Sequence, residues 1–217
     1  MKEYRKLLII TTLITLLPII AGLILWNQLP DQIATHWGAD GQANGWSGKT
    51  FAVFGLPCLL AAIHVFTCVI TLNDPKRKNI HRKPMLLIFW IIPIVSLVTN
   101  GITYLAAMGS DVNVSVIAFV LIGVVFIALG NYMPKLQQNY TVGIKLPWTL
   151  NSQENWNRTH RLGGKLFIAS GIVMIVSGFF GELAGNSTMF WVIFTAVIVL
   201  SAGIPAVYSF WLFRRGV

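Results

Sequence analysis

Charged residues, acidic ones above all, and cysteines are scarce in this 217-residue chain, and each shortage excludes a class of protein. Only 11% of the residues are charged and 7 are acidic, whereas 55% are hydrophobic. That composition is too apolar for a water-soluble domain and indicates an integral membrane protein. The two cysteines, Cys58 and Cys68, lie about 15 Å apart along one predicted helix, which excludes a disulfide within that helix.

Motifs for catalysis and metal binding are missing as well. The sequence contains no HExxH, no GxSxG and no glycine-rich phosphate loop followed by Lys-Ser/Thr. The four histidines are predicted to lie outside, inside and within the membrane, so that no two of them are placed to share a metal ion. We therefore expect no enzyme activity, no metal site and no cofactor.

Six apolar runs of membrane-spanning length fill most of the chain. Each holds about the 20 residues that a helix needs to cross a bilayer. The predicted fold is therefore all-α: a polytopic membrane protein with six transmembrane helices. We divide it into an N-terminal two-span domain with an outer loop, 1–84, and a four-span domain, 85–217. The predicted spans cover residues 7–26, 50–72, 85–108, 114–133, 166–184 and 189–213.

The positions of the basic residues predict how the spans are oriented. Of the 16 lysines and arginines, all but Lys49 fall in the N-terminus, in 73–84, in 134–165 or at the C-terminus. Positive residues near the ends of spans are retained in the cytoplasm. Both termini and 134–165 are therefore predicted to be cytoplasmic, and 27–49 to face outward. The net charge of +9 thus reflects topology and contact with lipid, and we expect no direct binding of nucleic acid.

The segment 134–165, here called the insert, is the one long stretch that hydrophobicity does not explain. Gly143 permits unusual backbone angles, and Pro147 disfavours helix at the residue before it. The first part of the insert is therefore predicted to be extended or turned.

A short helix is then predicted, capped by residue 151 or 152 and ended by the glycines at 163 and 164. It would carry a Glu154–Arg158 pair and present Trp156 and His160 on one face, lying along the membrane surface. Two interpretations of the insert are open. It is an interfacial connector with tryptophans among the headgroups, or it docks a cytoplasmic partner.

These residues carry a family resemblance. The sequence GIKLPWTL at 143–150, followed by Glu154, Trp156, Thr-His-Arg at 159–161 and Gly163, resembles the hallmark segment of the SdpI-type immunity proteins. The outer loop, with its prolyl, His-Trp and glycine positions, resembles the small membrane domain that often precedes this hallmark. The residues assigned to binding are Asn139, Gly143, Ile144, Lys145, Pro147, Trp148, Thr149, Glu154, Trp156, His160 and Gly163 in the insert, and Pro30, His36, Trp37, Gly41 and Trp46 in the outer loop.

The resemblance implies a non-catalytic protein of the bacterial cytoplasmic membrane that protects a toxin producer from its own secreted, membrane-active peptide. It also implies a cytoplasmic transcriptional repressor as a partner, which the best-known member of the family binds at the membrane. The outer loop would then be the first contact for the toxin, although a lid of interfacial tryptophans is the simpler explanation of its composition.

Polar residues deep in the spans suggest the alternative function. His64 and Asn100 are the deepest, and burying an ionisable group in lipid is costly enough to indicate a role. We favour a neutral His64 that bonds to a facing helix over a proton path. A small transporter or channel whose path passes these two residues is the alternative to immunity.

Overall fold

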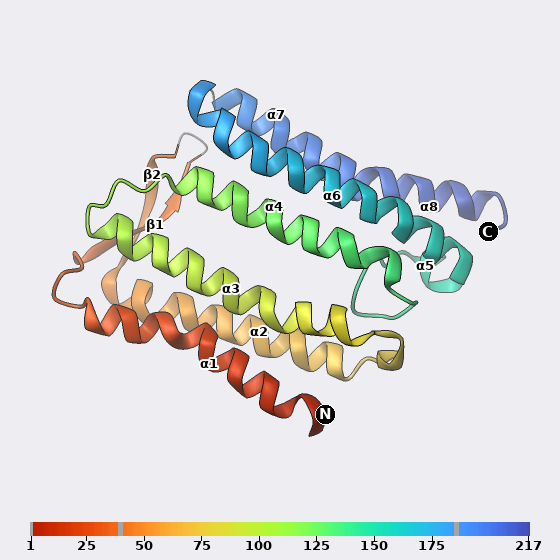
Figure 1. The fold of residues 1–217 in the computed structure, drawn as a ribbon, viewed down its shortest axis with the longest axis horizontal. Coiled ribbons are helices and arrows are strands. Elements are labelled where there is room, and N and C mark those ends of the chain that lie inside the picture. Colours follow the sequence, from red (N-terminus) through yellow and green to blue (C-terminus); the bar gives the residue numbers. More distant parts are fainter. Residues whose placement is uncertain (1, 39–40, 185–186) are drawn as a thin grey trace. The chain divides into compact units, whose positions relative to one another are not determined.

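The computed structural model describes residues 2–38, 41–184 and 187–217, but not the side chains of residues 2 and 181–190. Within these residues, six helical stretches are long and apolar enough to cross a membrane (Figure 1). The predicted all-α class with six transmembrane helices is therefore confirmed. The elements are α1 (Lys2–Ile24), α2 (Leu56–Leu72), α3 (Arg82–Ala107), α4 (Val114–Tyr132), α5 (Pro147–Asn151), α6 (Gln153–Ala184), α7 (Ser187–Ile198) and α8 (Ile204–Arg214).

Two of the spans contain a wider, π-helical turn. One turn, Phe51–Gly55, precedes α2, and the other, Val199–Gly203, joins α7 to α8. A proline follows each turn by two residues, at Pro57 and Pro205. Proline has no N–H, and its ring crowds the carbonyl four residues earlier, so that the wider turn accommodates it without breaking the span.

Residues 27–49 contain a β-hairpin that the sequence analysis did not predict. Strand β1 (Gln32–Trp37) pairs antiparallel with β2 (Ala43–Gly48), from Gln32 opposite Gly48 to Trp37 opposite Ala43. The register shifts near His36. Ile33 points into a buried apolar cluster, whereas the other residues of the two strands are exposed or half-buried.

Packing divides the chain into two compact units. The first unit comprises Met1–Val69 and Ile88–Ala118, and the second comprises Ile70–Leu87 and Phe119–Val217. The core of the first unit lies beneath the hairpin and consists of Leu29, Ile33, Ala52, Val53 and Tyr104. The insert belongs to the second unit, as does the basic turn that joins α2 to α3. The sequence-based division at residue 84 stays a prediction, because a packing unit and a sequence domain are different things.

The fifth span departs from the prediction. A separate helix ending at 163–164 was expected, but α6 runs without interruption from Gln153 to Ala184. The short helix along the membrane surface was therefore a wrong prediction. The glycines allow close packing and do not end the helix: a Cβ on Gly164 would lie 2.7 Å from the carbonyl oxygen of Gly130, and one on Gly171 would lie 2.5 Å from that of Gly123. These four glycines bring α4 and α6 into backbone contact.

Candidate functional site

Asn139 shapes the first half of the loop that opens the insert. Its side chain is fully buried. The Oδ1 atom accepts hydrogen bonds from the backbone N–H groups of Thr141 (3.0 Å) and Val142 (2.7 Å), and Nδ2 donates to the carbonyl of Gln137 (2.9 Å). A short amide side chain reaches the backbone two or three residues away, which stabilises a turn locally. The predicted turned conformation of this segment is confirmed.

Gly143 and His160 meet at the centre of the insert. Gly143 has a φ of 115°, and a Cβ there would lie 2.3 Å from Nε2 of His160. The backbone N–H of Ile144 donates to this Nε2 (2.9 Å), while Nδ1 of the ring faces the carbonyl of Trp156 at 2.8 Å. Nε2 must therefore be the unprotonated nitrogen, and Nδ1–H donates to Trp156. A neutral imidazole thus links the loop to α6, and only glycine leaves room for it.

Trp156 is the most voluminous fully buried side chain in this part of the protein. Its Nε1 donates to the carbonyl of Leu136 (2.7 Å), and its ring stacks on His160 with centroids 3.9 Å apart. Apolar contacts with Met133 and Leu136 complete its surroundings. The prediction that Trp156 and His160 are presented on an exposed face was wrong, because the loop folds over them. An aromatic and an imidazole four residues apart on a helix look the same in sequence whether they face solvent or a core.

Gly163 and Thr149 complete the buried part of the insert. A Cβ on Gly163 would lie 2.8 Å from both Cδ1 of Ile144 and Sδ of Met133, so this glycine leaves room for the loop. The Thr149 hydroxyl accepts from the N–H of Leu146 (2.8 Å) and donates to the carbonyl of Ile144 (2.9 Å). Leu146 is extended, with φ −117° and ψ 155°, ahead of Pro147. The predicted effect of this proline is confirmed.

Trp148 and Lys145 lie at the periphery of the insert. The indole of Trp148 is half-buried against Phe210 and Phe213 of α8, with ring centroids 5.3 and 6.0 Å apart. Lys145 is exposed and its Nζ donates to the carbonyl of Thr141 (2.8 Å). Five of the predicted residues are buried, namely Asn139, Thr149, Trp156, His160 and Gly163. Gly143, Ile144 and Trp148 are half-buried, and Lys145, Pro147 and Glu154 are exposed.

Asp74 is the main residue that the sequence analysis missed. It lies in the turn between α2 and α3 and is buried. Its Oδ2 accepts from the N–H of Tyr140 (2.9 Å) and the hydroxyl of Thr141 (2.7 Å), and Oδ1 accepts from the N–H of Lys76 (2.7 Å). An Asp-Pro pair in a basic turn indicates only a turn, and nothing in it points to a partner 66 residues away. Bonds to an ionised acceptor are the stronger kind.

Gln138 is a second missed residue and ties the same turn to the insert. Its Nε2 donates to the carbonyls of Thr149 (3.0 Å) and Leu150 (2.8 Å). Its Oε1 accepts from Nζ of Lys76 (2.7 Å), and its own carbonyl accepts from Nδ2 of Asn79 (2.7 Å). The insert loop is therefore held from two sides, by the basic turn and by α6.

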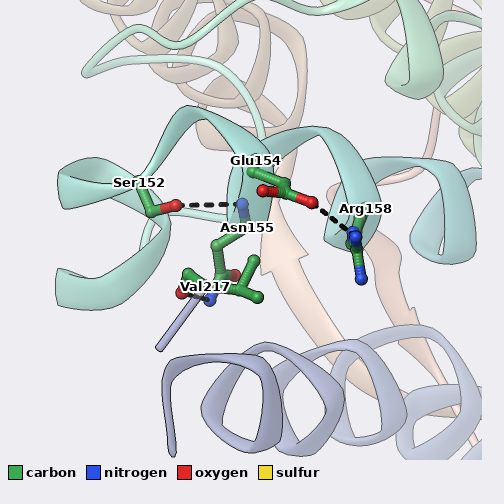
Figure 2. Close-up of polar contacts among 5 residues, drawn as sticks. All are labelled: Ser152, Glu154, Asn155, Arg158 and Val217. Carbon is green, nitrogen blue, oxygen red and sulfur yellow. Dashed lines mark hydrogen bonds and ion pairs between the residues drawn. The ribbon is translucent and has the colours of Figure 1, made fainter. Parts of the chain in front are cut away.

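The start of α6 is capped as the sequence predicts. The Ser152 hydroxyl accepts from the N–H of Asn155 (3.2 Å), and Glu154 pairs with Arg158 at the exposed surface (Figure 2). Asn155 itself was missed. It is fully buried, and its Nδ2 donates to the carbonyls of Ser209 (2.9 Å) and Val217 (3.3 Å). The first turn of α6 therefore also holds α8.

The outer-loop residues gather on the hairpin. Pro30 precedes β1, and His36 and Trp37 end it; Gly41 lies in the turn with a φ of 76°. Nδ1 of the exposed His36 ring lies 2.5 Å from Oδ1 of Asn44. Trp46, on β2, has 58% of its surface exposed. The outer-loop residues thus lie on an ordered pair of strands and the turn between them.

His64 and Asn100 lie in the buried polar interior of the first unit. Nε2 of His64 is 2.8 Å from the Thr11 hydroxyl of α1, so the predicted bond to a facing helix is confirmed. Nδ2 of Asn100 donates to the carbonyl of Ser96 (2.9 Å), whose hydroxyl donates to the carbonyl of Thr15 (2.8 Å). These bonds join α1, α2 and α3, as expected of polar side chains between spans.

Acidic and thiol groups are too dispersed for metal chemistry in the described part of the chain. Among the residues that the structure describes, no three His, Cys, Asp or Glu side chains form a group able to hold a metal ion. The insert and the α2–α3 turn that contacts it instead combine a buried carboxylate, a neutral imidazole and backbone groups that bond to one another. These bonds stabilise the loop that opens the insert, and Tyr140 and Lys145 remain exposed on its surface.

Sequence comparisons with known proteins match the segments that contain the insert and the hairpin. Residues 135–209 match the SdpI/YfhL protein family, and residues 13–61 match a domain of unknown function, DUF1648. The chain is 25% identical over 176 residues to "Immunity protein SdpI" of Bacillus subtilis (strain 168), covering 79% of this chain and 81% of that protein. No solved structure matches. The resemblance predicted from the insert and the outer loop is confirmed, and the six spans make this a multi-pass protein of the cell membrane.

Proposed function

From the premise that this chain is a relative of the SdpI-type immunity proteins, we propose that it protects a bacterium against a secreted, membrane-active peptide toxin. It acts by binding and not by catalysis. The observation that carries the proposal is the family match over residues 135–209. Those residues include nearly all of the insert, with Gly143, Trp156 and His160. The similarity to a named immunity protein over most of both chains supports the same function.

The hairpin is the proposed first contact for the toxin. It carries a half-buried Trp37, an exposed Trp46 and an exposed His36. Aromatic rings with a polar edge suit an amphipathic peptide at a membrane surface, because one side of each ring can contact apolar side chains while the other stays hydrated. The basic-residue pattern supports placing this hairpin on the outer side.

The insert is the proposed cytoplasmic effector, and recruitment of a repressor to its surface is part of the proposal. Its interior is occupied by its own hydrogen bonds, so a partner would bind the residues left outside, such as Tyr140 and Lys145. The turn that holds the loop through Asp74 is continuous with α2 and α3. A displacement of either span would therefore pull on this carboxylate and change how the loop is held.

Protection of a sensitive bacterium tests the function directly. Cells that express the chain are challenged with a panel of secreted peptides, and we expect survival against particular peptides only. The variant with His36→Ala and Trp46→Ala should lose protection at unchanged protein level in the membrane, whereas Gln28→Ala, exposed on the same loop, should keep it. Equal survival of cells with and without the chain against every peptide would exclude immunity.

Recruitment is tested separately. A Tyr140→Ala/Lys145→Ala variant should lose co-purification of the cytoplasmic partner, and Asn157→Ala, exposed on α6, should retain it. If the insert variant protects and recruits as the unaltered chain does, the insert surface has no part in the mechanism.

A further inference from the structure

We propose that the end of the second unit that carries the insert binds the headgroups of anionic phospholipids through cations seated on aromatic rings. Three such pairs occur among the described residues of this end. Nζ of Lys76 lies 5.0 Å from the ring centroid of Tyr140, and Nζ of Lys135 lies 5.6 Å from that of Tyr132. Cζ of Arg215 lies 3.9 Å from the ring centroid of Trp211.

The charge of this unit is strongly unbalanced. All but four of the 16 lysines and arginines belong to it, together with three acidic residues, Asp74, Glu154 and Glu182. Asp74 is buried and accepts bonds from the insert loop, and Glu154 pairs with Arg158. Glu182 is 28 residues further along α6, roughly 40 Å away in a helix. Among the described residues, Lys135 and Arg215 form no ion pair with an acidic side chain, so both can pair with an anion from outside the chain.

Ring contacts position a cation without neutralising it. The face of an aromatic ring attracts a cation through its quadrupole but carries no net charge. Lys135 and Arg215 are both exposed, so each keeps donors for a phosphate oxygen. The guanidinium of Arg215 can bond to two phosphate oxygens at once, and the ammonium of Lys135 supplies a compact charge.

The neighbourhood of these cations favours lipid over an acidic protein segment. Arg215 follows Phe210 and Phe213, which are 46% and 53% exposed, and Lys135 is the last residue of the span Val114–Lys135. Exposed apolar side chains one turn below a cation match the layering of a phospholipid, with acyl chains below the phosphate. An acidic peptide in water would satisfy the charges and leave the apolar surface uncovered.

Retention of lipid by the purified full-length protein tests the proposal. The protein in a zwitterionic detergent is titrated with phosphatidylglycerol or phosphatidylcholine, and bound lipid is counted by native mass spectrometry. We expect retention of phosphatidylglycerol over phosphatidylcholine. A Lys135→Gln/Arg215→Gln variant should bind phosphatidylglycerol on the order of 25-fold more weakly, since each charge near an anionic surface contributes about fivefold. Lys76 is left unchanged because it also bonds to Gln138.

Control variants distinguish cations that contact an aromatic ring from exposed cations that do not. Lys83→Gln/Arg214→Gln removes the same charge from two exposed positions without a described ring contact. Its affinity should fall by less than that of the first variant, because no ring holds these two cations in place. Lys135→Arg/Arg215→Lys should retain binding, which also shows that a loss in the first variant is not misfolding. Equal losses in both glutamine variants, or no preference for the anionic lipid, would overturn the proposal. Polyglutamate that displaces the lipid with the same residue dependence would also overturn it. Neither result depends on toxin protection.

Discussion

At the scale of single residues, the insert owes its shape to polar side chains whose partners are all internal. His160 uses one ring nitrogen for α6 and the other for the loop, and Asp74 uses both carboxylate oxygens. Removing either side chain leaves a backbone N–H without its acceptor. A buried group in that state costs about 1–3 kcal/mol.

The Asp74→Ala variant should loosen the loop locally. We expect the amide of Tyr140 to exchange hydrogen on the order of 10- to 100-fold faster, as loss of about 1–3 kcal/mol implies. Hydrogen-exchange mass spectrometry of peptides covering 139–146 measures this. Asp31→Ala, which breaks an exposed ion pair with Lys49, is the control and should leave those peptides unchanged. Unchanged exchange in Asp74→Ala would mean that this carboxylate does not hold the loop.

The His160→Ala variant should destabilise the protein more broadly. It removes the acceptor of the Ile144 N–H and the ring that stacks on Trp156. We expect the free energy of unfolding in detergent to fall by about 2–4 kcal/mol, combining an unpaired N–H with a cavity. Denaturant titration followed by tryptophan fluorescence measures it. His36→Ala, on the exposed hairpin, should change it by less than about 0.5 kcal/mol, and a similar loss in both variants would contradict the assigned role of His160.

At the scale of elements, the α4–α6 contact is the part of the second unit most sensitive to small changes. Gly130 and Gly164 approach each other reciprocally: a Cβ on either would lie 2.7 Å from the carbonyl oxygen of the other. Backbone contacts this close allow extensive van der Waals packing between spans, where the hydrophobic effect gives no preference for protein over lipid. The insert begins at the end of one of these helices and runs into the other.

The Gly164→Ala variant should therefore lower the thermal midpoint in detergent by several degrees, because the helices must separate to admit a methyl group. Gly101→Ala is the matched control. Gly101 also lies in a helix, but a Cβ there would meet no atom within 4 Å apart from its neighbours in the chain and the backbone of its own helix. Alanine there should be neutral or slightly stabilising, since it favours helix. Equal midpoints for the two variants would show that the close contact adds nothing to stability.

At the scale of the whole molecule, the proposed function depends on sidedness. The hairpin must face the medium and the insert must face the cytoplasm. We expect a cysteine at Gly48, which has open space around it, to react in whole cells with an impermeant maleimide. A cysteine at the exposed Gln153 should react only after lysis. Both are introduced with the exposed Cys58 replaced by alanine, and labelling of both in intact cells would refute the arrangement.

Much of this protein follows from local properties of the chain. Apolar run length and composition suffice for the six spans, because the thickness of the bilayer leaves few alternatives. The Ser152 cap, the Glu154–Arg158 pair and the extended residue before Pro147 follow from rules that act over a few residues. The family resemblance also came from short stretches of sequence, the residues at 143–163 and those of the outer loop.

Tertiary contacts decided the rest. Trp156 and His160 are buried because a loop that begins 20 residues earlier folds over them, and Asp74 acquires its role from a partner 66 residues away. Whether Gly163 and Gly164 end a helix or admit a neighbour depends on which helix packs there. Local sequence determines which backbone conformations have low free energy. Burial depends on several segments at once, and no pattern within one segment specifies which segments will pack against it.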